Sequence, residues 1–203
     1  MGDVPDARHP SSSSYRATNA RQLVKGSHVI QAQQWIDARL SPGTFKQSTS
    51  DGGDHWQVVL PFGWYEIGVL QFALEQASTR IGISVEDITA EVAATNAEQD
   101  LPSIYRAFLR IAQPKRVLAF TPRLWSTYVS FGSATAVKND PGHYIGQGDG
   151  FPESLVPWVA GCWRGFIPGT IAVAGGTVDR QRIVRTWQAD DGSYSVQLEV
   201  HYH

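Results

Sequence analysis

The chain has 203 residues, a formal charge of −2, 42% hydrophobic and 18% charged residues, and one cysteine, Cys162. This composition is typical of a soluble globular protein with a sizeable core. The small, interspersed charge argues against nucleic acid or an anionic membrane surface as a partner. A single cysteine excludes an internal disulfide and a zinc site built from several cysteines. With no membrane-spanning apolar run and no signal pattern, we expect a cytoplasmic protein.

Composition divides the chain into a tail, residues 1–20, and one domain, residues 21–203. The tail contains Pro5, Pro10 and four consecutive serines, with almost no large apolar side chains. Such a segment cannot bury enough surface to offset the entropy lost on ordering. We therefore predict a disordered tail followed by a single α+β domain.

Apolar residues at helical spacing predict helices over most of residues 23–130. One helix ends at Ser41-Pro42-Gly43, a second ends near Gly82, and a third starts after the N-cap Ser84. Residues 44–56 are polar and predict a loop. The third helix is expected to fray over residues 96–100, and another to open at 101–103. Pro122 either kinks the last of these helices or marks its start.

The remaining sequence predicts a small antiparallel sheet with a helix packed on it. A strand over 134–138 leads to a turn at 139–142, and residues 146–150 predict a glycine-rich loop. An apolar helix over 155–174 precedes a hairpin whose strands cover 182–188 and 193–203. Strict alternation in the last strand predicts one buried and one wet face. The fold class is α+β: an N-terminal helical layer on a small antiparallel sheet, with a long late helix and a C-terminal β-hairpin.

Several short motifs resemble those of a known group of domains. They are Val24-Lys25-Gly26-Ser27, Leu60-Pro61 with Trp64-Tyr65, Pro102 with Tyr105 and Phe108, Gly161-Cys162 with Gly165-Phe166, and the closing hairpin. With the element order, they resemble the fold of heme-nitric-oxide-binding domains, 4-vinyl reductase sensor domains and small TRAPP vesicle-tethering subunits. Within that group the chain is most similar to an uncharacterised family abundant in myxobacteria. The likeness covers residues 23–203.

The chain departs from the ligand chemistry that this resemblance implies. Heme-binding members carry a histidine in the helix matching residues 117–130, and a Tyr-x-Ser-x-Arg motif; neither is found here. Heme is therefore not expected. The cysteine-rich zinc site of the reductase-like sensors needs more than one cysteine. The TRAPP acyl chain is attached to a cysteine in an early helix, whereas Cys162 lies in the late one. We expect no cofactor.

No catalytic or metal-binding constellation stands out in the sequence. We interpret Cys162 as a small buried hydrophobe, and His201 and His203 as solvated side chains at the chain end rather than metal ligands. His28 and His143 have no evident partners. The acidic residues near 51–54 read as a solvated turn, not a calcium loop. We predict no catalytic residues, no metal site and, in the favoured interpretation, no enzymatic activity.

Aromatic side chains are the remaining functional lead. Seven fall at inward or boundary positions of different elements: Trp64, Tyr65, Tyr105, Trp125, Tyr128, Trp163 and Trp187. They either line a pocket for a small apolar or aromatic ligand, or close-pack the core. The leading hypothesis is a non-enzymatic, ligand-binding regulatory module with a protein partner or as a homodimer. The alternative is an interaction or scaffold domain with a filled core; an unrecognised enzyme is least favoured.

Overall fold

The computed structural model describes residues 21–51, 58–109 and 113–203, with side chains for all of these except residues 50, 51 and 100–109. The predicted tail lies outside the described residues. The described fold is α+β, as predicted. The elements are β1 (Leu23–Lys25), α1 (Gly26–Arg39), α2 (Thr44–Asp51), β2 (Trp64–Glu66), α3 (Ile67–Ile81), α4 (Val85–Leu109), α5 (Pro114–Leu118), α6 (Thr121–Tyr128), β3 (Ser133–Asp140), β4 (His143–Phe151), the 3₁₀ turn η1 (Glu153–Leu155), α7 (Val156–Val173), β5 (Val178–Gln188) and β6 (Tyr194–Tyr202).

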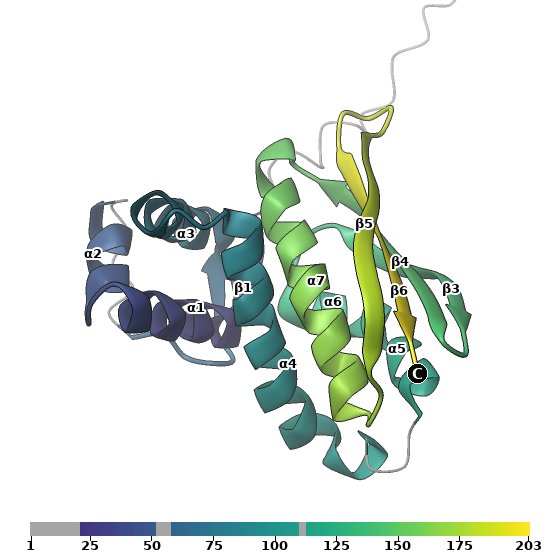
Figure 1. The fold of residues 1–203 in the computed structure, drawn as a ribbon. Helices are drawn as coiled ribbons and strands as arrows, with labels where there is room; N and C mark the ends of the chain where they lie inside the picture. The colour runs from purple at the N-terminus through teal and green to yellow at the C-terminus, as the bar shows by residue number, and fades with distance from the viewer. Residues whose placement is uncertain (1–20, 52–57, 110–112) are drawn as a thin grey trace, which may run out of the picture.

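Two helices, α4 and α7, lie side by side at the centre of the molecule (Figure 1). The sheet covers one side of α7, and α1 to α3 lie beyond α4. Gly161, Gly165 and Gly169 of α7 face α4 at intervals of four residues, and their neighbours there advance from Glu86 to Ala97. The two helices are therefore parallel. A side chain at any of these three positions would collide with α4. Because glycine has no side chain, the two helix backbones can approach closely.

Four strands form the main sheet in the order β3-β4-β6-β5, with every pair antiparallel. A long connection through α7 separates β4 from β6, its neighbour in the sheet. Val196, Leu198 and Val200 of β6 are fully buried, as their alternation predicts. A second, two-stranded sheet joins β1 to β2.

The predicted helix signals are confirmed where a local cap specifies them. Gly82 ends α3 in the left-handed conformation (φ 78°), and the Asp87 amide donates to Ser84 Oγ at 3.1 Å to cap α4. Pro122 lies in the first turn of α6, so it marks the helix start rather than a kink. Gly175 (φ 80°) follows α7 at the predicted break.

Three predictions in the helical half are wrong. Residues 23–25 form a strand before the first helix, because they pair with β2. Residues 44–51 form helix α2, which buries Phe45, and the Phe45 amide donates a hydrogen bond to Asp37 Oδ1 at 2.9 Å. Residues 85–109 form one continuous helix, since packing against α7 continues past Asn96 to Ala97. The polar residues that predicted fraying include Asn96, which is only 1% exposed.

The predicted glycine-rich loop at 146–150 is also wrong, because it forms most of strand β4. A Cβ at Gly146 would lie 2.5 Å from Trp163 Cζ3, and one at Gly148 would lie 2.8 Å from Phe151 Cε2. Real Cβ atoms do not approach other atoms so closely. These glycines therefore make room for aromatic rings that pack flat on the sheet.

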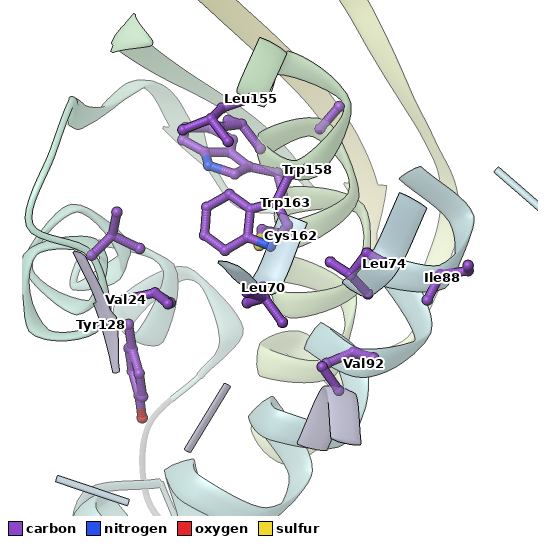
Figure 2. Close-up of a cluster of buried hydrophobic side chains, with 14 of the residues drawn as sticks. Val24, Leu70, Leu74, Ile88, Val92, Tyr128, Leu155, Trp158, Cys162 and Trp163 are labelled. Carbon is purple, nitrogen blue, oxygen red and sulfur yellow. The ribbon is translucent and has the colours of Figure 1, made fainter. Parts of the chain in front are cut away.

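The core is continuous from the N-terminal helices through α7 to the sheet. Trp158, Cys162 and Trp163 project from α7 into it, close to Leu155 (Figure 2). Trp158 is 1% exposed and ranks among the largest fully buried side chains. Among the described helices, none combines the length and the apolarity required to cross a membrane.

Candidate functional site

A small cavity of about 40 Å³ lies among α1, α6, β3 and α7. Its lining is mostly aromatic and aliphatic, with three titratable side chains, those of His28, Tyr128 and Cys162. The lining residues are His28, Thr121, Leu124, Trp125, Tyr128, Val129, Ala134, Cys162, Trp163, Phe166 and Ile167. Because one water-sized sphere occupies roughly 10–15 Å³ on this scale, the cavity holds about three.

His28 and Cys162 meet at this cavity from opposite ends of the chain. His28 Nε2 lies 3.7 Å from Cys162 Sγ, and the two residues are 5% and 4% exposed. His28 follows the buried stripe of α1, four and seven residues before Ala32 and Trp35. The expectation that His28 lacks a partner is wrong, because Tyr128 and Trp158 also pack around its ring.

Burial keeps the His28–Cys162 pair neutral. Loss of solvation lowers the pKa of His28 to about 4, and the same cause raises the pKa of the Cys162 thiol well above its usual value. A reactive thiolate needs the opposite shift, a depressed pKa beside a cation. Arg164 does not supply one, since it points to Glu86 and Asp87 at 2.7 and 2.9 Å. The neutral pair therefore suits ligand contact rather than nucleophilic catalysis.

One atom of this pair remains without a described interaction. His28 Nδ1 is buried and has no hydrogen-bond partner in the described part of the chain. An unpaired buried polar atom costs roughly 1–3 kcal/mol. A polar atom of a bound molecule would recover that energy at His28 if it reached Nδ1.

Trp125 of α6 is the centre of the aromatic wall. Its ring centroid lies 5.5 Å from that of Phe151 and 6.2 Å from that of Trp163. The indole nitrogen donates to the Phe131 carbonyl oxygen at 3.0 Å, which fixes the ring. The cavity wall is consequently rigid on the side of the sheet.

Three of the seven predicted pocket residues line the cavity: Trp125, Tyr128 and Trp163. Trp64 lies elsewhere, 41% exposed on β2, with Lys25 Nζ 4.0 Å above its ring. Tyr65 packs near Gly26 and Gly63, and its hydroxyl accepts from the Leu60 amide at 2.7 Å.

The remaining two predicted residues are Trp187 and Tyr105. Trp187 lies on the hairpin strand β5 under the Arg185 guanidinium, 4.2 Å from its ring. The side chain of Tyr105 is outside the described residues. Most of the cavity lining therefore comes from α6 and α7, and His28 of α1 is among the lining residues that the sequence prediction omitted.

The comparisons with known proteins give a fold but no family. No protein-family model matches the chain, and no curated protein matches it. Solved structures match over 88% of this chain. The iron(II) unliganded form of an H-NOX mutant protein from K. algicida has a TM-score of 0.67, 10% identity and 96% of its own chain covered. This chain has the H-NOX fold.

Two further structures support the same fold. A mutant H-NOX from T. tengcongensis matches with a TM-score of 0.67, 12% identity and 97% of its chain covered. An oxygen-binding H-NOX domain related to soluble guanylate cyclases, in its oxygen complex, matches at 0.64, 12% and 94%. Identities this low establish the arrangement of helices and strands and leave the ligand of this chain open.

Solved structures with this fold include heme proteins, and a heme is larger than the cavity found in this chain. Drug-sized ligands already need pockets of roughly 300–1,000 Å³, and a porphyrin is larger. The cavity of about 40 Å³ is bounded by packed indole rings. Of its side chains with iron-binding chemistry, which are those of His28, Cys162 and Tyr128, the first two face each other at 3.7 Å. α6 carries no histidine.

Proposed function

We propose that the chain is a non-enzymatic, ligand-binding regulatory module, and that its ligand occupies the cavity beside His28. The carrying observation is an aromatic-lined cavity that contains a buried, neutral histidine with an unpaired Nδ1 atom. Buried polar atoms in folded proteins are nearly always paired, so such an atom indicates a place for a further contact. The fold shared with H-NOX sensor domains is compatible with this role.

The cavity volume narrows the ligand. Benzene occupies an engineered cavity of roughly 150 Å³, so about 40 Å³ suits a neutral molecule of only a few heavy atoms. An aromatic ligand would require Trp125 or Trp163 to move. A small, mostly apolar ligand that directs one polar atom at His28 is therefore favoured over an aromatic ligand.

Xenon binding tests whether the cavity can take up a ligand, because xenon is a small apolar atom. We expect xenon-dependent chemical shift changes in NMR spectra at residues around Ala134 and Ile167. Ala134→Leu should fill the space and abolish these changes. Ala136→Leu is the matched control, since it makes the same change two residues further along β3 at an exposed position. If xenon causes no shift in the wild type, the cavity is closed and the proposal fails.

Heme absence is part of the proposal and has its own test. Hemin is titrated into the purified protein while absorbance is recorded. We expect no saturable Soret band, because neither the cavity volume nor α6 supplies a heme site. A strong band at one equivalent would overturn this part. Native mass spectrometry of freshly purified protein would report a retained heme at the same time as the oligomeric state.

An exposed apolar segment favours the second function, a protein-interaction domain. Val58, Leu60, Phe62 and Trp64 are 73%, 61%, 86% and 41% exposed at alternate positions before α3. Hydrogen bonds fix the backbone here: Ser27 donates to the Pro61 carbonyl oxygen and Gly26 to that of Gly63, both at 3.0 Å. A fixed apolar surface is characteristic of an interaction site.

Self-association tests this alternative. We expect Phe62→Ser to lower the mass measured by light scattering if a second copy covers the segment. Phe72→Ser is the control, because Phe72 is an exposed phenylalanine on α3, 36% exposed. A monomeric wild type would exclude the homodimer and leave a different protein as the partner.

A further inference from the structure

The face of the sheet opposite α7 holds a group of side chains outside the cavity site. His143 of β4 is the direct cross-strand partner of His201 of β6, which in turn pairs with Arg180 of β5. In the next row Glu199 pairs with Arg182. Because residues two apart on a strand share a face, Glu199 and His201 lie together with His143.

Three potential metal ligands converge in this group. Glu199 Oε1 lies 3.0 Å from His143 Nε2 and 3.3 Å from His201 Nε2, and the three ligand atoms lie within 4.8 Å of one another. Zinc–ligand bonds of about 2.0–2.2 Å in tetrahedral geometry place ligand atoms about 3.4 Å apart. The two Glu199–histidine distances already meet that spacing. The stacked histidine rings, 4.3 Å apart, need only tilt towards each other.

The hydrogen bonding around His201 is internally inconsistent without a further group. Arg180 Nη2 lies 3.1 Å from His201 Nε2 and can only donate, so Nε2 must present its lone pair. The same lone pair then faces Glu199 Oε1 at 3.3 Å, where two acceptors repel. Protonated Nε2 would instead oppose the arginine donor. A cation between His201 and Glu199 would accept both lone pairs.

We propose that His143, Glu199 and His201 bind a divalent transition-metal ion that accepts imidazole and carboxylate ligands, with Zn²⁺ as the representative. This set offers two nitrogens and one oxygen and leaves coordination positions open towards solvent. The ion would connect β4 to β6, the two strands that α7 separates in sequence. The site is independent of the cavity ligand and replaces the expectation that His201 is merely solvated; His203 instead contacts Asp179 at 2.8 Å.

Two arginines act on this site in opposite ways. Arg182 contacts the other carboxylate oxygen, Glu199 Oε2, through Nε at 2.9 Å and Nη2 at 2.8 Å. It orients the carboxylate, leaves Oε1 for the ion, and is the main cause that lowers the pKa of Glu199 to about 2. Arg180, in contrast, competes for His201 Nε2 and brings a positive charge. It must swing away when the ion binds, and its exposed position permits that movement.

Zinc binding to the untagged full chain is the test. Isothermal titration should show one Zn²⁺ per chain, and His143→Gln and His201→Gln should each weaken binding at least tenfold. His203→Gln is the matched control, a neighbouring histidine outside the cluster, and should leave binding unchanged. Arg180→Gln should tighten binding several-fold, because it removes the competing donor and its charge.

A second measurement does not depend on the variants. Co²⁺ bound to the wild type should give visible bands of nitrogen and oxygen coordination without the near-ultraviolet thiolate transition that Cys162 would produce. The proposal is overturned if the wild type does not bind one Zn²⁺ per chain at about 10 μM Zn²⁺. It is equally overturned if the His143→Gln and His201→Gln chains remain folded by circular dichroism and bind as tightly as wild type.

Discussion

Replacing His28 by leucine should change how stability depends on pH. Burial lowers the pKa of His28 from 6.5 to about 4. Between these two values the unfolded chain binds a proton that the folded chain does not, so stability falls as pH is lowered. Each pKa unit corresponds to about 1.4 kcal/mol, which gives about 3 kcal/mol over the whole window and about 2 kcal/mol by pH 5. His28→Leu removes this contribution.

Urea unfolding at pH 8 and at pH 5 measures the effect. The wild type should lose about 2 kcal/mol more free energy of unfolding between these conditions than His28→Leu does. The effect of the substitution on packing is the same at both pH values. It therefore cancels when the change in the free energy of unfolding between pH 8 and pH 5 is compared for the two proteins. His203→Gln should follow the wild type, because His203 is exposed. Coincident pH dependence of wild type and His28→Leu would show that the folded state already solvates the imidazolium, and would refute the cavity as a dry site.

Three further predictions test the helix pair, helix α3 and the sheet. Gly165→Ala should destabilise by at least about 2 kcal/mol in urea unfolding, because its Cβ would strike the Ala90 carbonyl oxygen on α4. Gly68→Ala, where a Cβ meets nothing, should instead stabilise α3 by about 0.5–1 kcal/mol. Arg182→Gln should raise the pKa of Glu199, whose depressed value stabilises the fold above pH 4.5 and is lost towards pH 2. Its acid-unfolding midpoint, measured by circular dichroism, should therefore rise; an unchanged midpoint would contradict this.

Elements with local signals could be predicted from the sequence, and elements that depend on distant partners could not. Ser84 and Gly82 mark helix ends with their own side chain or backbone conformation, so no knowledge of the fold is required. Helix α2 has one large buried residue, Phe45, and forms because α1 and α3 pack against it. Strand β4 contains glycines that indicate a loop until the rings above them are known.

The same distinction applies to the candidate site. Trp125, Tyr128 and Trp163 were predictable because they lie at buried or partly buried helical positions. His28 was detectable in principle, since it continues the buried stripe of α1 at helical spacing, but a lone histidine on such a stripe carries no chemical signal. His143 was beyond reach, because its pairing with His201 depends on the β4–β6 register across α7.

The likeness to H-NOX structures at 10–13% identity shows that very different sequences form this fold. The glycines of α7 and the small residues of α4 set the separation of two parallel helices, and the sheet rests on the other side of α7. None of these contacts depends on which group fills the space between α6 and α7. Trp125 and Trp163 occupy much of that space here, with their rings 6.2 Å apart. Because close packing stabilises a core whether rings or a cofactor supply the volume, the same architecture is compatible with a filled interior. In the proposed function, the small remaining space and His28, which lines it, therefore select the ligand.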